Sequence, residues 1–242
     1  MRIYKLICLI VLFLVLTIIP LYISTGENLG DVEISILEDS LDVLCLVNRD
    51  HLLEKDYPDQ NIPKYKLEEV KLPTTKGKHL LRGVANIALN TLFEAAYAEN
   101  IKLFVGSSYR TYRTQEVMHY NRVKRIGFDD GYVQKAGASE HQTGLAVDVV
   151  SREYANMFQK SFGETQEGRW LRENCAEFGF IIRYPENKEE ITGISYEPWH
   201  LRYVGKEVAS YIMDNDLTLE EFSARRIVAL GTYYGEVMNW NN

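Results

Sequence analysis

Residues 139–150 read Ser-Glu-His-Gln-Thr-Gly-Leu-Ala-Val-Asp-Val-Val, and this stretch decides the fold. The run from Leu145 to Val150 is short and apolar, which is typical of a buried strand. Asp148 interrupts the run, with Val147 and Val149 on either side. A carboxylate is costly to bury unless it is paired or binds a cation. The stretch therefore predicts a buried strand whose acid faces positive charge.

Two histidines and a second acid are suitable partners for Asp148. His141 lies in the same stretch, and His200 ends the sequence Glu-Pro-Trp-His that begins at Glu197. Two imidazoles and one carboxylate suit Zn²⁺, and catalytic zinc keeps three protein ligands and one position for water. Glu197 is close enough in sequence to lie beside the metal and take a proton from that water. Residue types alone leave the alternatives open: the histidines can be structural, and Asp148 can pair with an arginine or cap a turn.

The other histidines and the cysteines give weaker signals. His51, His79 and His119 lack an acidic or histidine partner at ligand spacing, so we assign them to the surface or to structural roles. Cys45 and Cys175 would be free to form a disulfide in an oxidising compartment. No cysteine-rich pattern surrounds them, which favours two buried thiols.

Helices and strands are predicted in irregular order around this stretch. Periodic apolar residues predict a helix over 79–100, and shorter patterns predict helices over 111–126, 169–178, 206–213 and 218–230. Strands are predicted over 101–106, 145–150, 180–184 and 199–204. Because no regular strand–helix–strand alternation appears, we expect an α+β fold with a central antiparallel sheet flanked by helices. The predicted zinc ligands draw both halves into one domain, residues 41–242.

The first 24 residues differ from the rest of the chain. They contain 19 apolar residues and no acid, with Arg2 and Lys5 as the only charges. We expect a signal anchor that spans the membrane once, followed by a stalk over 25–40 and an extracytoplasmic domain. The alternative is a signal peptide that is cleaved and a secreted protein. The remaining residues carry 25 Lys and Arg against 34 Asp and Glu, which disfavours nucleic-acid binding.

Longer motifs resemble a known enzyme family. The patterns Ser139-x-His141-x6-Asp148 and Glu197-x-x-His200 are similar to those of the LAS family of zinc peptidases. The wider sequence resembles VanY-type D-alanyl-D-alanine carboxypeptidases and related LdcB-type enzymes. The similar stretches are LVNR (46–49), SSYRTYRTQ (107–115), SEHQTGLAVDV (139–149), WLRENCAEFGFIIRYP (170–185) and ITGISYEPWHLRYVG (191–205). The resemblance implies a fold of the LAS or hedgehog type.

The resemblance also implies a role for each motif residue. His141, Asp148 and His200 would bind one zinc ion per chain, and Glu197 would be the general base and later the acid. Arg110 would stabilise the oxyanion. Ser139 and Gln115 would bind the terminal residue of the substrate, with a capping role as the alternative. Trp199 and Tyr196 would shape the wall of the pocket or, equally, belong to the core.

The expected reaction is removal of the C-terminal D-alanine from peptidoglycan stem peptides. The same set of residues would also serve a D,D-dipeptidase, an L,D-carboxypeptidase acting on tetrapeptides, or an endopeptidase. A zinc-stabilised wall-binding module without catalysis is the alternative from another class, and the presence of both Glu197 and Arg110 disfavours it. The sequence does not predict an oligomeric state.

Overall fold

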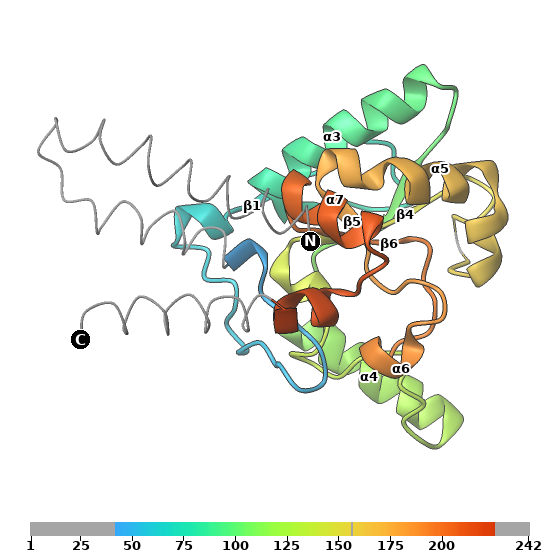
Figure 1. The fold of residues 1–242 in the computed structure, drawn as a ribbon. Helices are drawn as coiled ribbons and strands as arrows, with labels where there is room; N and C mark the ends of the chain where they lie inside the picture. The colour runs from blue at the N-terminus through green and yellow to red at the C-terminus, as the bar shows by residue number, and fades with distance from the viewer. Residues whose placement is uncertain (1–41, 156, 226–242) are drawn as a thin grey trace, which may run out of the picture. The chain divides into compact units, whose positions relative to one another are not determined.

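The structure, a computed structural model, describes residues 42–155 and 157–225 of the 242-residue chain. The chain divides into two compact units, Met1–Cys45 and Leu46–Asn242, and the second contains every element named below (Figure 1). The predicted anchor and stalk, residues 1–40, lie outside the described residues. Within the part that is described, no helix has the length and apolar character needed to cross a membrane.

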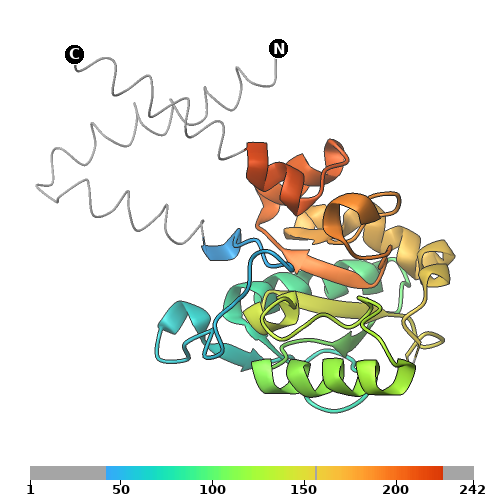
Figure 2. The ribbon, with the colours of Figure 1, turned by 90° about the horizontal axis from the view of Figure 1, so that it is seen from below.

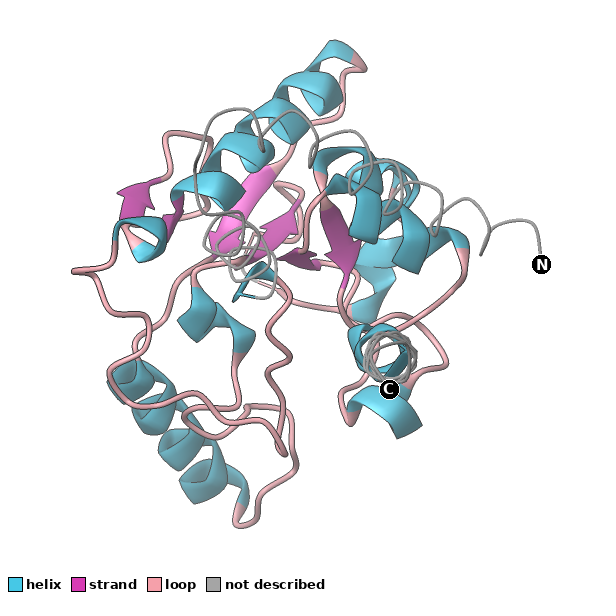
Figure 3. Ribbon diagram, turned by 60° about the vertical axis from the view of Figure 1, so that its left-hand side comes forward, coloured by secondary structure: helices cyan, strands magenta, loops and turns pink. Residues whose placement is uncertain are grey.

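The second unit mixes helices and strands, as the sequence predicts (Figure 3). Its α-helices are α3 (Gly83–Ala98), α4 (Tyr112–Ile126), α5 (Gln166–Asn174), α6 (Glu189–Thr192) and α7 (Lys206–Asp214). Short 3-10 segments are η1 (Pro63–Tyr65), η2 (Glu140–Thr143), η3 (Lys160–Glu164) and η4 (Cys175–Phe178). The strands are β1 (Leu67–Glu69), β2 (Leu80–Arg82), β3 (Phe104–Ser107), β4 (Ala146–Val150), β5 (Phe180–Ile182) and β6 (His200–Tyr203).

The central sheet has four strands in the order β3-β4-β6-β5, and every neighbouring pair is antiparallel. β1 and β2 form a separate antiparallel pair. These two sheets confirm the predicted α+β class with an antiparallel centre. The register places Asp148 beside His200 on one neighbour and beside Ser107 on the other. Because side chains alternate between the two faces of a strand, these three residues share one face of the sheet.

The opposite face of the sheet carries the hydrophobic core. Val147, Val149 and Leu201 each neighbour a site residue in sequence, and all three belong to the buried apolar cluster. α3 supplies Leu89, Leu92, Phe93 and Ala96 to this cluster, and α5 supplies Trp170 and Leu171. Full burial of each such aliphatic side chain stabilises the fold by about 1.5–3 kcal/mol. The strands that carry the site are therefore fixed from behind by apolar packing.

α4 lies on the other side of the strands from α3, α5 and α7 (Figures 1 and 2). Its start is fixed by Thr111, whose hydroxyl accepts a hydrogen bond from the backbone N–H of Thr114 at 3.1 Å. Its end is fixed by Gly127, whose φ of 89° lies in the left-handed region that glycine adopts without strain. Gln115 is the only residue of α4 that is buried. The helix thus presents one polar side chain to the interior, next to the loop that carries Arg110.

Candidate metal centre

Strands β4 and β6 bring an acid and a histidine together. The Nδ1 atom of His200 lies 3.0 Å from Oδ1 of Asp148, and both side chains are about 5% exposed. His200 starts β6 directly opposite Asp148, so this contact follows from the strand register. The acid predicted to need a partner therefore has one on the neighbouring strand.

η2, the short turn before β4, supplies the second imidazole. The Nε2 atom of His141 lies 3.3 Å from the other carboxylate oxygen of Asp148. The Nδ1 atom of His141 is 2.7 Å from the carbonyl oxygen of Ser108, and a carbonyl oxygen can only accept. His141 Nδ1 therefore carries the hydrogen, which leaves Nε2 free as a ligand. The rings of His141 and His200 meet edge to face, with centroids 4.9 Å apart.

The geometry of this group fits a metal ion. One nitrogen or oxygen atom from each of His141, Asp148 and His200 lies within 4.8 Å of the others, and all three residues are buried. Two ligand atoms, each about 2.0–2.2 Å from a tetrahedral zinc, lie roughly 3.3–3.5 Å apart, close to the separations found here. The predicted ligand set therefore comes together in space. His141, Asp148 and His200 are the residues that could hold the metal.

The charge states of the group also suit a cation. Burial opposes the charge on Asp148, but the two imidazoles outweigh it and hold the pKa of this carboxyl well below its usual range. Burial, with the nearby Arg110 guanidinium, lowers the pKa of His141 to about 4. Burial also disfavours the charged form of His200, but the facing carboxylates of Asp148 and Glu140 outweigh it and raise its pKa to about 9. A metal that binds at neutral pH would therefore displace a proton from His200.

Glu197 stands beside the metal group, in the turn that leads into β6. Its backbone carbonyl accepts a hydrogen bond from the His200 N–H at 3.1 Å, which fixes the turn. Its Oε2 atom lies 3.9 Å from Nδ1 of His200, and its side chain is 18% exposed. Burial raises the pKa of Glu197 to about 7, despite the opposing effect of His200. A carboxylate poised near neutral pH can accept a proton and return it.

Arg110 reaches the same group from the loop between β3 and α4. Its guanidinium donates to Oε1 of Gln115 at 2.8 Å and to Oγ of Ser107 at 3.1 Å. One nitrogen lies 3.9 Å from Oδ2 of Asp148. Burial lowers the pKa of Arg110 from a very high ordinary value, and Asp148 and Glu197 oppose this effect. The structure thus holds a cation beside the metal group with two neutral side chains.

Four further residues are predicted to contact the substrate or shape the pocket: Ser139, Gln115, Trp199 and Tyr196. Ser139 directly precedes η2 and is buried, and its side chain makes no hydrogen bond that caps this described turn. Gln115 holds Arg110 on one side and donates to the carbonyl oxygen of Gln134 at 2.6 Å on the other. Trp199 and Tyr196 belong to the buried apolar cluster. For all four, contact with a substrate stays a prediction.

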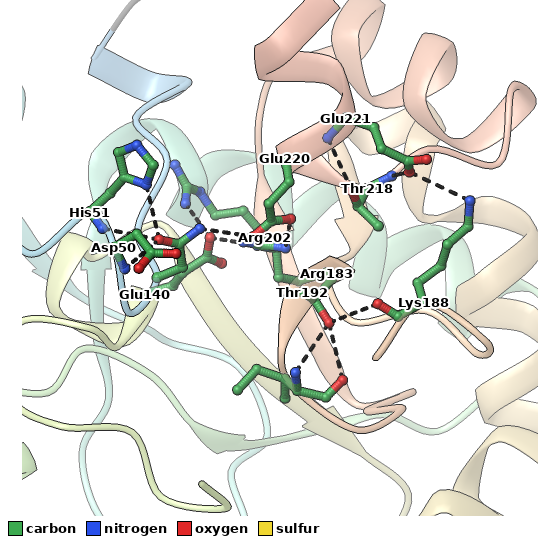
Figure 4. Close-up of polar contacts among 12 residues, drawn as sticks. Asp50, His51, Glu140, Arg183, Lys188, Thr192, Arg202, Thr218, Glu220 and Glu221 are labelled. Atoms are coloured by element: carbon green, nitrogen blue, oxygen red, sulfur yellow. Dashed lines mark hydrogen bonds and ion pairs between the residues drawn. The ribbon is translucent and has the colours of Figure 1, made fainter. Parts of the chain in front are cut away.

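A cluster of buried charges behind His200 was not predicted from the sequence. Figure 4 shows Glu140 in contact with Arg183 and Arg202, and Arg183 in turn with Glu220. Burial opposes the charge on Glu140, but the two guanidiniums outweigh it and hold its pKa well below the usual range. A signal for this cluster was present in the sequence. Arg183 follows Phe-Ile-Ile and Arg202 follows His-Leu, so each continues a predicted strand as Asp148 does.

A cleft lies beside α4, and its lining includes none of the three possible metal ligands, Glu197 or Arg110. Its lining residues come mainly from α4 and from the loop that follows it, and they carry both signs of charge; they include Tyr112, Glu116, His119, Asp129, Gln134, Lys135 and Ala138. Ala138 directly precedes Ser139, and the Gln134 carbonyl holds Gln115. Two lining residues of the cleft thus adjoin predicted site residues, Ala138 through the chain and Gln134 through a hydrogen bond.

Comparison with known proteins gives one consistent family. The family model described as VanY, D-alanyl-D-alanine carboxypeptidase, matches residues 78–206. The putative carboxypeptidase YodJ of Bacillus subtilis (strain 168) is 45% identical over 185 residues, which are 74% of this chain and 66% of that protein. Among the first three curated relatives, the matched part covers between 35% and 66% of the relative's length, always less than two thirds.

Two solved structures share the fold. The LdcB LD-carboxypeptidase is 42% identical, with a TM-score of 0.69 over 75% of this chain and 86% of that one. A mutant of the vancomycin resistance D,D-pentapeptidase VanY from a VanB-type cassette, in complex with Zn(II), is 35% identical, with a TM-score of 0.61. That similarity covers 75% of this chain and 98% of the other.

Proposed function

The chain belongs to the VanY family of D-alanyl-D-alanine carboxypeptidases, and we propose that it is a zinc-dependent peptidase that removes D-alanine from the end of peptidoglycan stem peptides. The observation that carries the proposal is the arrangement around His141, Asp148 and His200. A carboxylate with a pKa near 7 and a partly buried guanidinium both stand beside these three residues. A wall-binding module would need the metal group but neither of these two side chains.

The residues of the chain divide the chemistry between them. When bound, zinc supplies a Lewis acid and lowers the pKa of a water molecule towards about 7. Glu197 takes the proton from the attacking water, and its raised pKa matches this task at neutral pH. Once the peptide carbonyl has been attacked, Glu197 returns the proton to the leaving amine. One carboxylate thus acts first as base and then as acid.

Arg110 stabilises the charge that develops on the carbonyl oxygen. Its guanidinium is already oriented by Ser107 and Gln115, so little reorganisation is needed during the reaction. A preorganised donor of this kind typically contributes about 2.7–4 kcal/mol to transition-state stabilisation.

The substrate we propose is a pentapeptide stem that ends in D-Ala-D-Ala, with the terminal residue contacting Ser139 and Gln115. The rest of the peptide would occupy the cleft beside α4, whose mixed charges suit a chain with free amino and carboxyl groups. A specific observation favours a second candidate: the LdcB LD-carboxypeptidase has a higher TM-score than the VanY structure. Cleavage of tetrapeptides between an L- and a D-residue is therefore the alternative.

We also propose that the protein works outside the cytoplasm, tethered by residues 1–24. The support is the apolar composition of this segment and its positive flank at Arg2 and Lys5. A wall peptide is accessible only from that side of the membrane. Cleavage of the segment and secretion of the domain would place the enzyme on the same side.

The test uses the purified full chain in detergent. We expect about one zinc per chain by elemental analysis and, by mass spectrometry, release of free D-alanine from a pentapeptide stem. Release of D-Ala-D-Ala would show a dipeptidase, and cleavage of the tetrapeptide alone would show the L,D-specific alternative. Glu153→Ala, an exposed acid outside the site, is the control and should behave as the parent chain. Bound zinc with no cleavage of any stem peptide would refute the proposed enzyme.

A further inference from the structure

Glu140 is a buried acid with one oxygen fully used and one not. The residue is 1% exposed. Its Oε1 atom accepts a hydrogen bond from Nε of Arg183 and another from Nη1 of Arg202, both at 2.7 Å. Figure 4 shows these contacts together with those between Arg183 and Glu220. Both guanidiniums approach the same oxygen, which leaves Oε2 available for a different donor.

The group that faces Oε2 is the outer nitrogen of His200. The distance from His200 Nε2 to Glu140 Oε2 is 3.6 Å. Both atoms are buried, and neither forms a hydrogen bond with any residue that the structure describes. A hydrogen bond between them needs only a small approach, because an N–H···O bond spans about 2.7–3.2 Å. Two buried polar atoms of complementary type that face each other are rarely left without that bond.

We infer that Glu140 is a positioning residue for the metal ligand His200, because its Oε2 accepts the Nε2 hydrogen and so keeps Nδ1 free to bind zinc. This inference rests on the zinc site of the proposed function. A ligating histidine usually donates its other ring hydrogen to a carboxylate, a carbonyl or water, which fixes the tautomer and the orientation of the ring. The carbonyl of Ser108 does this for His141. Glu140 does it for His200.

Replacing Glu140 with glutamine gives a specific expectation. The single amide oxygen would stay with Arg183 and Arg202, because both of them can only donate. The amide nitrogen would then turn towards Nε2 of His200 and require that atom to accept. The ring hydrogen would move to Nδ1, the atom that faces Asp148 and the metal. Glu140→Gln therefore favours the tautomer that cannot bind zinc.

The matched control is Glu220→Gln, because this substitution also removes one negative charge from the cluster of buried charges. The carboxylate of Glu220 accepts two hydrogen bonds from Arg183, at 2.8 and 2.7 Å. Among the described residues, the Glu220 carboxylate accepts hydrogen bonds from Arg183 and Asn48 and none from His200. Glu220→Gln thus leaves a buried arginine with less compensation, as Glu140→Gln does, but it spares the histidine. A merely structural role for Glu140 would make the two variants alike.

The experiment measures zinc affinity by competition with a chromophoric chelator at one fixed pH, using the full chain and both variants. We expect Glu140→Gln to weaken zinc binding by about 10- to 100-fold, while Glu220→Gln stays close to the parent chain. Equal affinity for Glu140→Gln and the parent, or equal weakening in both variants, would overturn the inference. Failure of the parent chain to bind zinc would overturn the proposed function as well.

A second measurement does not depend on a folded variant. NMR of the imidazole nitrogens in the zinc-loaded parent chain should show His200 with metal at Nδ1 and a slowly exchanging hydrogen at Nε2. Metal at Nε2, or a ring hydrogen that exchanges as fast as one in contact with bulk water, would overturn the role assigned to Glu140.

Discussion

Gln115 distinguishes two accounts of the site, and substitutions at Gln115 and Arg110 test them. The sequence assigns Gln115 to the substrate, whereas the structure places its amide against the guanidinium of Arg110 at 2.8 Å. If Gln115 acts only by orienting Arg110, replacing Gln115 should not change kcat further in a variant that already lacks Arg110. The informative set is Arg110→Ala, Gln115→Met and the double variant, because methionine keeps the volume of glutamine without its amide.

The expected magnitudes follow from the contacts. Loss of Arg110 removes the cation beside the reacting carbonyl, and such losses reduce kcat by about 10²- to 10³-fold. Gln115→Met removes one of two side-chain acceptors of Arg110, and Ser107 remains. A net hydrogen bond contributes about 0.5–1.5 kcal/mol, so we expect kcat to fall roughly 2- to 12-fold. The double variant should be no slower than Arg110→Ala alone.

The assay is release of D-alanine from the pentapeptide stem, with kcat and KM measured separately for each variant. Zinc content and melting temperature are followed in parallel, because Gln115→Met also leaves the Gln134 carbonyl without its donor. Arg113→Ala is the control: this arginine is also on α4, its side chain is 76% exposed, and it pairs with Glu116. A double variant about tenfold slower than Arg110→Ala would refute the reasoning and return Gln115 to direct contact with substrate.

Three further predictions concern other parts of the molecule. Glu197→Gln should retain zinc, because Glu197 is not in the ligand set, yet lose about 10²- to 10⁴-fold in kcat; zinc content and turnover are measured on the same sample. Zinc at a free concentration of 100 times its Kd should stabilise the protein by about 2.7 kcal/mol, so removing the zinc with a chelator should lower the melting temperature by roughly 5–11 °C. A melting curve that the chelator leaves unchanged would argue against a metal site. Burial raises the pKa of Cys175 to about 12, so an alkylating reagent should label partly exposed Cys45 in the native protein and Cys175 only after unfolding, as peptide mapping will show.

The sheet could be predicted from the sequence because its strands are apolar and short. The predicted ranges 145–150, 180–184 and 199–204 correspond to β4, β5 and β6 within two residues at each end. The capping box at Thr218 is also confirmed: its hydroxyl accepts from the Glu221 N–H, and the Glu221 carboxylate accepts from the Thr218 N–H. The predicted end of that helix lies outside the described residues. The start of the helix predicted over 79–100 is wrong, because Leu80–Arg82 pairs with β1 as strand β2 and α3 begins only at Gly83. The helix predicted over 169–178 also differs, because α5 begins at Gln166 and ends at Asn174.

That difference has a local cause. Thr165 accepts a hydrogen bond from the Gly168 N–H at 3.0 Å and so starts α5 earlier than the apolar pattern suggests. Cys175–Phe178 continues as the 3-10 turn η4, and Gly179 closes it with a φ of 84°. Hydrophobic periodicity indicates which face of a helix is buried. It does not predict which hydroxyl caps the helix or where the α-helix changes to a 3-10 helix.

The two cysteines also show what a sequence pattern can and cannot predict. Cys175 is fully buried in the apolar cluster, and within the described residues neither it nor Cys45 forms a disulfide. The prediction of a buried thiol is confirmed for Cys175, whereas Cys45 is partly exposed. Spacing identifies a disulfide framework only when several cysteines repeat, whereas a single pair carries no such information.

The buried charges of Glu140, Arg183 and Arg202 behind His200 could not be paired from the sequence. An acid such as Asp148 inside an apolar strand needs a partner of opposite charge, and the same holds for Arg183 and Arg202. Applied to these arginines, this rule predicts a buried acid but cannot select one of the 34 acidic residues. Glu140 precedes Arg183 by 43 positions and Arg202 by 62, so only the folded sheet brings them together. Two buried guanidiniums on one carboxylate oxygen are a costly arrangement for stability alone, since apolar replacements often serve as well. The arrangement is explained more fully if the second oxygen has a task, and the outer nitrogen of a metal ligand lies directly opposite it.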